Sequence, residues 1–501
     1  MTIEEKINDL ANRRTLIEQG GGIAAINKIH ASSQLTARER IIKLLDHNSF
    51  VEVGAFIKPR ATDFNMNASD APADGVITGY GAIEGQLVYV YSQDKMVMGG
   101  ALGEMHAQKI VKMYEMAYKV GAPVIALLDS AGIRLQESLD ALDGFGQIFM
   151  KQSLLSGVVP QLTAVLGNCG GGAAIIPSMS DFTFMTSTGS ALYVNSANAL
   201  DAKVEMADIS SAQFHARTTG LIDFIYETDE EVMEAIRKLM VMLPLNNSED
   251  ALVVPCDDDP NRISPSLNVE AVSARAVLSE IADHNEYLEI QPQYATDVVA
   301  SFIRMNGMTV GVVGNDDMDG ILTLKGCEKM TDFVNVCDAY HIPVVTLTNV
   351  TGFEPTLSAE KLGMSKSIAK LTYAFANATT SKINVIINKA YGSAYIAQNS
   401  KHIGADLVYA WPSAQIATMN ANSAVRIMYA KEIENAEVAT EFIAEKIAEY
   451  ENNQASPYVA AGRGYVDNII EPAATRKRII AAIEMLYTKH ESGPEKKHGT
   501  V

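Results

Sequence analysis

The sequence has few cysteines and no long apolar segment. Only four cysteines occur among 501 residues, at positions 169, 256, 327 and 337, and no two have the CxxC spacing of a zinc or redox motif. This spacing argues against a disulfide scaffold and against a metal centre. No apolar run approaches the ~18 residues that a membrane span needs, and the N-terminus lacks the apolar segment of a secretory signal. We therefore expect a soluble, cytoplasmic protein.

Positive charge is also scarce. Lys and Arg number 40 against 60 Asp and Glu, so the formal net charge is −20. This balance argues against nucleic acid and anionic membranes as non-specific partners, and solubility is its simplest explanation. The hydrophobic fraction of 48% is ordinary for a globular protein with a sizeable core. The length suits two large domains.

Motifs that carry side-chain or phosphate chemistry are missing. The sequence contains no GxxxxGK[ST] loop and no GxGxxG turn followed by an acidic residue, which argues against P-loop and dinucleotide sites. Ser393 lies in a glycine turn but lacks the GxSxG spacing of a nucleophile elbow. His106, His215 and His402 stand alone in the sequence. Cys169 is most simply a small buried residue.

The sequence does contain an internal repeat. Four landmarks recur at a nearly constant offset: Gly85 as Gly307 (307 − 85 = 222), Asp94 as Asp316 (222), Pro123 as Pro343 (220), and Gly171 as Gly392 (221). The run DHNSF at 46–50 also returns as DHNEY at 283–287, offset by 237, so the first half carries an insertion after it. A duplicated chain predicts two related domains.

Each half alternates apolar strands with amphipathic helices. After a helical N-terminal region of ~45 residues, the first half has predicted strands at 87–91, 123–128 and 162–166 and helices at 103–120, 134–155 and from 171. The second half repeats this order with strands at 310–313, 344–347 and 383–387 and helices at 326–340, 365–376 and after 392. The alternation predicts an α/β fold with parallel strands. A stretch rich in Pro, Asn and Asp (243–260) separates the halves, and we predict domains of residues 1–255 and 256–501.

Paired glycine turns are the candidate functional feature. LGNCGGGA (166–173) and YGSA (391–394) each follow a strand and open a helix, where backbone N–H groups favour an anion. A tight structural turn is the alternative interpretation of either one alone. A second pair of turns, around Gly132 and Gly352, ends the preceding strand of each half. An oxyanion hole needs two donors from separate segments, and such paired turns could supply them.

Together these motifs resemble the biotin-dependent acyl-CoA carboxyltransferase family. The resemblance covers almost the whole chain and is carried by GGALGEMH (99–106), DSAGIRLQE (129–137), the 167–173 loop, DFTFM (181–185), KAYGSAY (389–395), AWP (410–412) and KKHG (496–499). The family includes the carboxyltransferase subunits of propionyl-CoA and acetyl-CoA carboxylases, transcarboxylase, and the alpha subunits of sodium-pumping decarboxylases. The run from 54 to 66 leans toward the decarboxylase subunits, with the carboxylases close behind.

The resemblance implies a fold, an activity and partners. It implies two crotonase-like domains, each a β-β-α superhelix, and a hexamer built as a dimer of trimers, with the active site between the N-terminal domain of one protomer and the C-terminal domain of another. The N-terminal domain would bind a CoA thioester and the C-terminal domain would bind biotin. This chain has no Met-Lys-Met biotinylation sequence, so the biotin would sit on a separate biotin carboxyl carrier protein. A biotin carboxylase or membrane decarboxylase subunits would be further partners.

The resemblance also assigns roles to individual residues. The amides of Gly171 and Gly172 would hold the thioester enolate oxygen, and those of Ser393 and Ala394 the ureido oxygen of biotin. No metal is required. The remaining predicted substrate-binding residues are Gly132, Ile133, Arg134, Gly170, Gly352, Phe353, Gly392 and Tyr395. From the residues alone, Arg134 could contact a phosphate or cap a helix.

Some positions depart from the family pattern. The family usually has Gly where this chain has Ala131, Ser138, Ser393, Asn420 and Ser423. Most of these changes lie in the C-terminal half, so a catalytically degenerate CoA-binding paralogue is an alternative function, and a ClpP-like serine hydrolase is a weaker one. Ser393 retains its amide if the local backbone conformation suits an L-residue.

Overall fold

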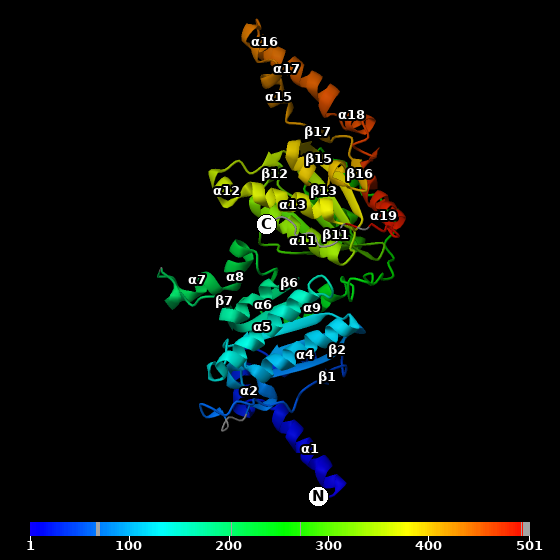
Figure 1. Ribbon diagram of the computed structural model, residues 1–501. Helices are drawn as coiled ribbons and strands as arrows, with labels where there is room; N and C mark the ends of the chain where they lie inside the picture. Colours follow the sequence, from blue (N-terminus) through cyan, green and yellow to red (C-terminus); the bar gives the residue numbers. More distant parts are fainter. Residues whose placement is uncertain (67–70, 202, 271, 492, 494–501) are drawn as a thin grey trace. The chain divides into compact units, whose positions relative to one another are not determined.

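The chain folds into two compact units, Met1–Ala251 and Leu252–Val501. They are seen in a computed structural model that describes residues 1–66, 71–201, 203–270, 272–491 and 493 (Figure 1). The predicted boundary at 255 lies just past this division. The run at 496–499 lies outside the described residues.

Three helices precede the first sheet, as the sequence predicts. They are α1 (Ile3–Glu18), α2 (Ile23–Ala31) and α3 (Ala37–Leu44). Thr2 and Thr36 begin α1 and α3 with capping boxes, each completed by a glutamate three residues on. Gly20 and Gly22 have positive φ, which ends α1 and turns the chain into α2.

The first unit is built on one eight-stranded mixed sheet. Its order is β1-β2-β3-β4-β5-β6-β8, with β7 also paired to β5. The first two pairings are antiparallel and the others are parallel. The strands are β1 (Val51–Glu52), β2 (Val76–Ile83), β3 (Gln86–Gln93), β4 (Val124–Ser130), β5 (Gln161–Gly170), β6 (Phe182–Thr186), β7 (Ala191–Tyr193) and β8 (Phe224–Tyr226).

Helices cover this sheet and bury its apolar side chains. Residues of α4 (Glu104–Val120) and α5 (Ser138–Leu155) share one core with those of β3, β4 and β5. The helix α9 (Asp229–Met240) packs against α3 and the sheet. The shorter helices are α6 (Ile175–Ser178), α7 (Met206–Ser210) and α8 (Ala212–Phe214).

The second unit repeats this topology. Its sheet has the order β18-β16-β15-β13-β11-β10-β9 with β17 paired to β15; the β9–β10 and β10–β11 pairings are antiparallel and the others are parallel. The strands are β9 (Tyr287–Glu289), β10 (Val298–Met305), β11 (Met308–Asn315), β13 (Val344–Val350), β15 (Lys382–Tyr391), β16 (Leu407–Ala410), β17 (Gln415–Ala417) and β18 (Asn468–Ile469), with β12 (Ile321–Leu322) and β14 (Gly352–Phe353) as a separate pair. The predicted duplication is therefore present in strand order.

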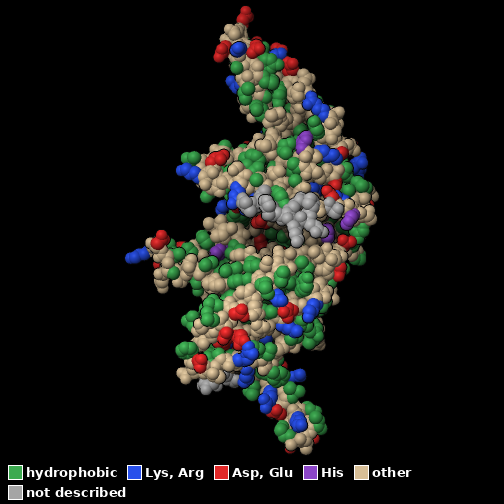
Figure 2. All heavy atoms as spheres, in the orientation of Figure 1, with side chains coloured by type: hydrophobic (Ala, Val, Ile, Leu, Met, Phe, Trp, Pro, Cys, Tyr) green, Lys and Arg blue, Asp and Glu red, His purple; other side chains and the backbone are tan. Residues whose placement is uncertain are grey.

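The helices of the second unit follow the same plan. The core is formed by α10 (Ala274–Ile281), the sheet and α19 (Thr475–Leu486), and α11 (Leu324–Ala339) packs against α13 (Met364–Asn377). Others are α12 (Leu357–Leu362), α14 (Gly392–Ala397) and α18 (Pro457–Gly462). The helices α15 (Ala421–Met428), α16 (Ala430–Asn435) and α17 (Ala439–Tyr450) project from the sheet (Figure 1). Hydrophobic side chains gather on their surface (Figure 2). Ile427 of α15, for example, is 68% exposed.

The duplication extends to individual hydrogen bonds. Asp46 accepts from the amides of Glu84 and Gly85 in the β2–β3 turn, and Asp283 accepts from the amides of Asn306 and Gly307 in the β10–β11 turn. Each carboxylate is also paired with an arginine from a late helix, Arg237 in the first unit and Arg476 in the second. The repeated run at 46–50 and 283–287 thus holds the β2–β3 hairpin in the first unit and the β10–β11 hairpin in the second.

Two details differ from the sequence prediction. The helix expected from residue 134 begins at Ser138, because residues 131–137 form a turn and one 3₁₀ turn (Leu135–Glu137). The prediction of parallel strands also omitted the antiparallel strands that open each unit, because β2 and β10 are as apolar as their neighbours and carry no separate pattern.

Ser138 begins α5 in a backbone conformation that favours glycine. Its φ of 45° and ψ of −112° cost an L-residue on the order of 1–3 kcal/mol. We predict that Ser138→Gly raises the free energy of unfolding by about 1 kcal/mol, since the relieved strain exceeds the added chain entropy of glycine. The control Ser153→Gly, in the regular part of α5, should lower it by roughly 0.5 kcal/mol. Thermal unfolding of the two variants measures the difference, and a lower melting temperature for Ser138→Gly contradicts the prediction.

Candidate active site

The site begins with a glycine of positive φ at the end of one strand in each unit. Gly171 follows β5 with φ 61°, and Gly392 follows β15 with φ 58°. The left-handed conformation turns each chain out of the strand and into a helix, the 3₁₀ turn Gly171–Ala174 and the helix α14. The preceding residues, Gly170 and Tyr391, make no side-chain cap.

Both turns therefore present unpaired amides. The first N–H groups of a helix have no partner within it. Among the described residues, neither Gly171 and Gly172 nor Ser393 and Ala394 donate these amides to another group. The four residues that open each helix also share one exposure pattern, half-buried, exposed, buried and buried. In this alignment Gly171 corresponds to Gly392 and Gly172 to Ser393, so the predicted pairs Gly171–Gly172 and Ser393–Ala394 lie in the same turn of each unit but are shifted by one residue.

The turn around Gly132 lies beside the first glycine loop. A side chain at Gly132 would lie 3.6 Å from the carbonyl oxygen of Gly170. Asn168 Nδ2 donates to the carbonyl of Ser130 at 2.9 Å, and Ser130 pairs with Cys169 across the β4–β5 ladder. The structure thus places the Gly132 turn beside Gly170, which leads into the Gly171 and Gly172 amides.

The second unit joins its turns in the same way. Gly352 and Phe353 pair with Ile321 and Leu322, just as Ile133 bridges Leu102 in the first unit. Asn349 contacts both sides of its turn, donating to Asp317 O at 3.1 Å and accepting from the amide of Lys389 at 3.4 Å. The ladder β13–β15 places Val350 beside Ala390, two residues before Gly392.

The neighbours of the first loop explain its glycines. A side chain at Gly167 would overlap the carboxylate of Asp129. One at Gly170 would lie 2.7 Å from the ring of Tyr193, whose hydroxyl donates to Asn168 Oδ1 at 3.2 Å. Sequence reasoning did not find Tyr193, because it comes from β7 and only the β5–β7 ladder brings it to the loop.

The departures in the second unit are compatible with its backbone. The residue with positive φ is Gly392, and Ser393 lies in the right-handed part of α14. The serine therefore keeps its amide in place without strain. Asn420 is the N-cap of α15, where its side chain accepts from the amide of Ser423 at 2.9 Å. These two residues thus complete a helix start.

The side chain of Arg134 faces inward. It is 1% exposed, and Nη1 lies 2.6 Å from Asp74 Oδ1 and 2.7 Å from Glu137 Oε1. Burial raises the pKa of Asp74 even though Arg134 opposes the shift. Sequence reasoning missed Asp74, which lies 60 residues away in the chain (134 − 74), although the i,i+3 spacing of Arg134 and Glu137 was visible.

Tyr395 follows the second amide pair in α14. It is buried, its hydroxyl has no partner among the described residues, and burial raises its pKa to about 12. Its ring contacts His402 edge-on, with 5.9 Å between ring centroids, and His402 contacts Tyr465 in turn.

His106 and Cys169 are titratable side chains that are buried within the first unit. Burial lowers the pKa of His106 well below its usual value, and its Nδ1 donates to Asp74 O at 2.9 Å. Cys169 is fully buried, and burial raises the pKa of its thiol far above its ordinary value, which disfavours the reactive thiolate. In the part of the chain that the structure describes, no three His, Cys, Asp or Glu residues could hold a metal ion. The chemistry available at the turns is that of backbone donors.

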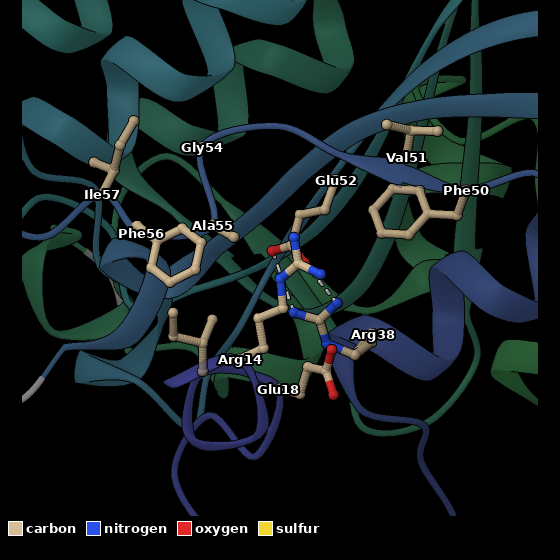
Figure 3. A pocket seen from close by; sticks show the side chains of 11 residues that line it. Arg14, Glu18, Arg38, Phe50, Val51, Glu52, Gly54, Ala55, Phe56 and Ile57 are labelled. Carbon is tan, nitrogen blue, oxygen red and sulfur yellow. Dashed lines mark hydrogen bonds and ion pairs between the residues drawn. The ribbon is translucent and has the colours of Figure 1, made fainter. Parts of the chain in front are cut away.

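A separate cavity of about 670 Å³ lies at the N-terminal end of the first unit (Figure 3). Arg38 makes two hydrogen bonds to Glu52 in its wall, and Phe50 and Phe56 line it. None of the residues of the glycine turns lines this cavity. No helix among the described residues is long and apolar enough to cross a membrane.

Two duplicated α/β units, each with an open pair of backbone amides where a strand turns into a helix, are the arrangement expected of an enzyme that stabilises oxyanions with its main chain. A model of the carboxyl transferase domain matches residues 28–501. The chain therefore belongs to the carboxyl transferase family, whose members catalyse carboxyl transfer.

Individual relatives agree over the whole length. The chain is 42% identical over 510 residues to the methylmalonyl-CoA decarboxylase subunit alpha of Propionigenium modestum, covering 99% of each. It is 42% identical over 510 residues to the methylmalonyl-CoA carboxyltransferase 12S subunit of Propionibacterium freudenreichii subsp. shermanii, covering 99% of this chain and 97% of that one. It is 40% identical over 512 residues to the propionyl-CoA carboxylase beta chain of Roseobacter denitrificans, covering 100% of each.

A solved structure shows the same fold. The crystal structure of transcarboxylase 12S, with methylmalonyl-coenzyme A and methylmalonic acid bound, matches with a TM-score of 0.97 and 41% identity, covering 100% of this chain and 98% of that one. The predicted crotonase-like carboxyltransferase fold and the predicted family are thus confirmed.

The contacts of the glycine loop lead to a matched pair of variants. Gly170→Ala should lower the free energy of unfolding by about 1–3 kcal/mol, because its Cβ would displace the Tyr193 ring, 2.7 Å away. Gly172→Ala, whose Cβ would lie 3.5 Å from Phe145, should change it by less than about 0.5 kcal/mol. Thermal unfolding of both proteins checks the prediction, and equal effects would contradict the assigned packing.

Proposed function

We propose that this chain transfers a carboxyl group between an acyl-CoA and biotin carried on a separate biotin carboxyl carrier protein. The observation that carries the proposal is an open pair of backbone amides at the strand-to-helix turn of each unit, Gly171 with Gly172 and Ser393 with Ala394. A carboxyl transfer has two reactants whose carbonyl oxygens gain negative charge. A duplicated fold with one such site per unit supplies a donor pair to each.

The first unit is assigned the acyl-CoA. Loss or gain of a carboxyl group next to a thioester places negative charge on the thioester oxygen, as in an enolate. The amides of Gly171 and Gly172 are suited to such an oxygen, because they open a helical turn and have no partner within it. Gly132, Ile133 and Gly170 border this loop, and Arg134 holds the turn from inside. Bound methylmalonyl-CoA in the transcarboxylase 12S structure supports a thioester of this class.

The second unit is assigned the biotin. When bound, biotin would accept a carboxyl group on a ureido nitrogen, and carboxybiotin would donate that group to a carbon nucleophile. The amides of Ser393 and Ala394 fit a ureido oxygen, because Gly392 turns them outward and no cap occupies them. Gly352, Phe353 and Tyr395 lie on the elements that border this turn. The fit depends on backbone alone, so the serine at 393 is no obstacle.

The proposed partners and assembly are inferred from those of the relatives. The names of the relatives are those of subunits of carboxylases, decarboxylases and a transcarboxylase, and the transcarboxylase 12S structure is described as a hexamer. We propose a hexamer in a cytoplasmic complex with a biotin carrier and either a biotin carboxylase or membrane decarboxylase subunits. Methylmalonyl-, malonyl-, glutaconyl- and propionyl-CoA are the candidate substrates.

Direct transfer is the test. The full-length protein is mixed with each candidate acyl-CoA and with free biotin or carboxybiotin, and the acyl-CoA products are separated by chromatography. We expect carboxyl transfer with at least one pair. Binding of acyl-CoA without turnover, even with a biotin carrier protein, would instead select the catalytically degenerate paralogue.

Backbone chemistry predicts how two neighbouring substitutions differ. Ser393→Ala keeps the amide and should leave kcat within about threefold of the wild type. Gly392→Ala should lower kcat at least tenfold, because an L-residue at φ 58° is strained and its Cβ would lie 3.0 Å from Thr418 O, so the next amides shift. Steady-state kinetics with both reactants measures each value. Loss of activity in Ser393→Ala would point to the hydroxyl as a nucleophile and overturn the assignment.

A further inference from the structure

A buried ion network supports the turn that borders the first amide pair. Arg134 lies between two acids, Asp74 and Glu137, and its Nη2 also donates to the carbonyl of Ala101 at 2.8 Å. All three charged residues are buried. Glu137 in turn accepts from the amide of Glu104 at 2.5 Å, at the start of α4. The guanidinium thus joins three separate segments of the first unit.

The network is anchored below the turn. Ala73 and Asp74 have φ values of 54° and 52°, a left-handed conformation that L-residues adopt only when the surroundings hold it. His106 donates to the carbonyl of Asp74, and Lys109 Nζ donates to that of Ala73 at 2.7 Å. Both donors come from α4, so one helix face fixes the loop that presents Asp74.

The network controls the backbone next to the glycine loop. The amide of Arg134 donates to Leu102 O at 2.9 Å, and the amide of Leu102 donates to Gly132 O at 2.8 Å. Gly132 in turn faces the carbonyl of Gly170, one residue before the first open amide. A movement of the Arg134 side chain would therefore pass directly to Gly132 and the loop beside it.

The second unit has the ladder without the network. The amide of Glu354 donates to Leu322 O as that of Arg134 does to Leu102 O, which aligns the two turns at an offset of 220 (354 − 134). At this offset Leu357 replaces Glu137, and it is 70% exposed. Glu354 accepts from Thr356, at 2.9 Å, within its own turn. Among the described residues, the ion network is thus specific to the first unit.

Buried ion pairs contribute little net stability, because desolvation offsets their attraction. Their geometry is nevertheless strict, since a planar guanidinium satisfies two carboxylates and a carbonyl only in one position. We propose that Asp74, Arg134 and Glu137 are positioning residues, which hold the Gly132–Ile133 turn against the Gly170 loop in the shape that binds the acyl-CoA. This inference rests on the proposed function for the identity of the ligand, and the geometry of the turn supports it independently.

The test uses the full-length protein with Arg134→Lys and Glu137→Gln. The lysine of Arg134→Lys keeps the positive charge but lacks the planar guanidinium that contacts both acids at once. The glutamine of Glu137→Gln keeps the shape of the side chain and one acceptor oxygen but loses the negative charge. The control is Arg476→Lys in the second unit, where Arg476 is also 1% exposed and lies 2.6 Å from Asp283. Amide hydrogen exchange is followed in peptides covering 130–137 and 167–174, together with the KM values for acyl-CoA and for biotin.

We expect Arg134→Lys to accelerate exchange in both peptides at least tenfold and to raise the KM for acyl-CoA at least tenfold, with the KM for biotin within twofold. Glu137→Gln should show the same changes to a smaller extent. Arg476→Lys should lower the melting temperature, but it should alter neither the exchange in the two peptides nor the KM for acyl-CoA. Unaltered exchange in Arg134→Lys, or an equal rise in both KM values, overturns the proposal. Absence of transfer by the wild type would instead overturn the proposed function, because the exchange measurement needs no turnover.

Discussion

A glycine in the left-handed conformation, at the end of one parallel strand in each unit, is the constraint on which the site depends. At Gly171 and Gly392 the chain leaves the sheet and begins a helix within one residue. An ordinary L-residue would resist this turn, and the following amides would then stay in the ladder or point elsewhere. The strand ends, the glycine and the helix start together leave two donors without a partner. A backbone site of this kind costs no side-chain ordering when a reactant arrives.

The rest of each unit holds that turn in place. The ladder β4–β5 in the first unit and β13–β15 in the second set two turns side by side, and both ladders change register just before the turn. The cores below are apolar and made of neighbouring helices and strands. Beyond this shared frame the units differ. The first adds Arg134 and its two buried acids, whereas the second relies on the short β12–β14 pair. Duplication therefore supplied the common geometry, and later substitutions made the two sites unequal.

Much of this could be predicted from the sequence, because the signals are local. Apolar runs alternating with amphipathic stretches marked the parallel strands and main helices, and the constant offset of about 221 between halves marked the duplication. The glycine turns could be found because a glycine between a strand and a helix is typical of a turn with positive φ. The antiparallel strands β2 and β10 were missed, since their composition resembles that of the parallel strands beside them. The start of α5 was placed four residues early, because Leu135 and Glu137 continue the helical pattern through the turn.

The sequence alone determined the α/β class, the repeat and the two glycine turns, because these follow from periodicity and from the rare conformation that glycine permits, whereas the family resemblance supplied the proposed amide donors. Only the tertiary structure decided which groups surround them. Tyr193 reaches Gly170 through a parallel pairing, and Asp74 reaches Arg134 across 60 residues (134 − 74). It also showed that Ser393 needs no glycine conformation, which a residue letter cannot reveal. Contacts between distant segments depend on how helices and strands pack, and this packing depends on all the elements of a unit together rather than on any local pattern.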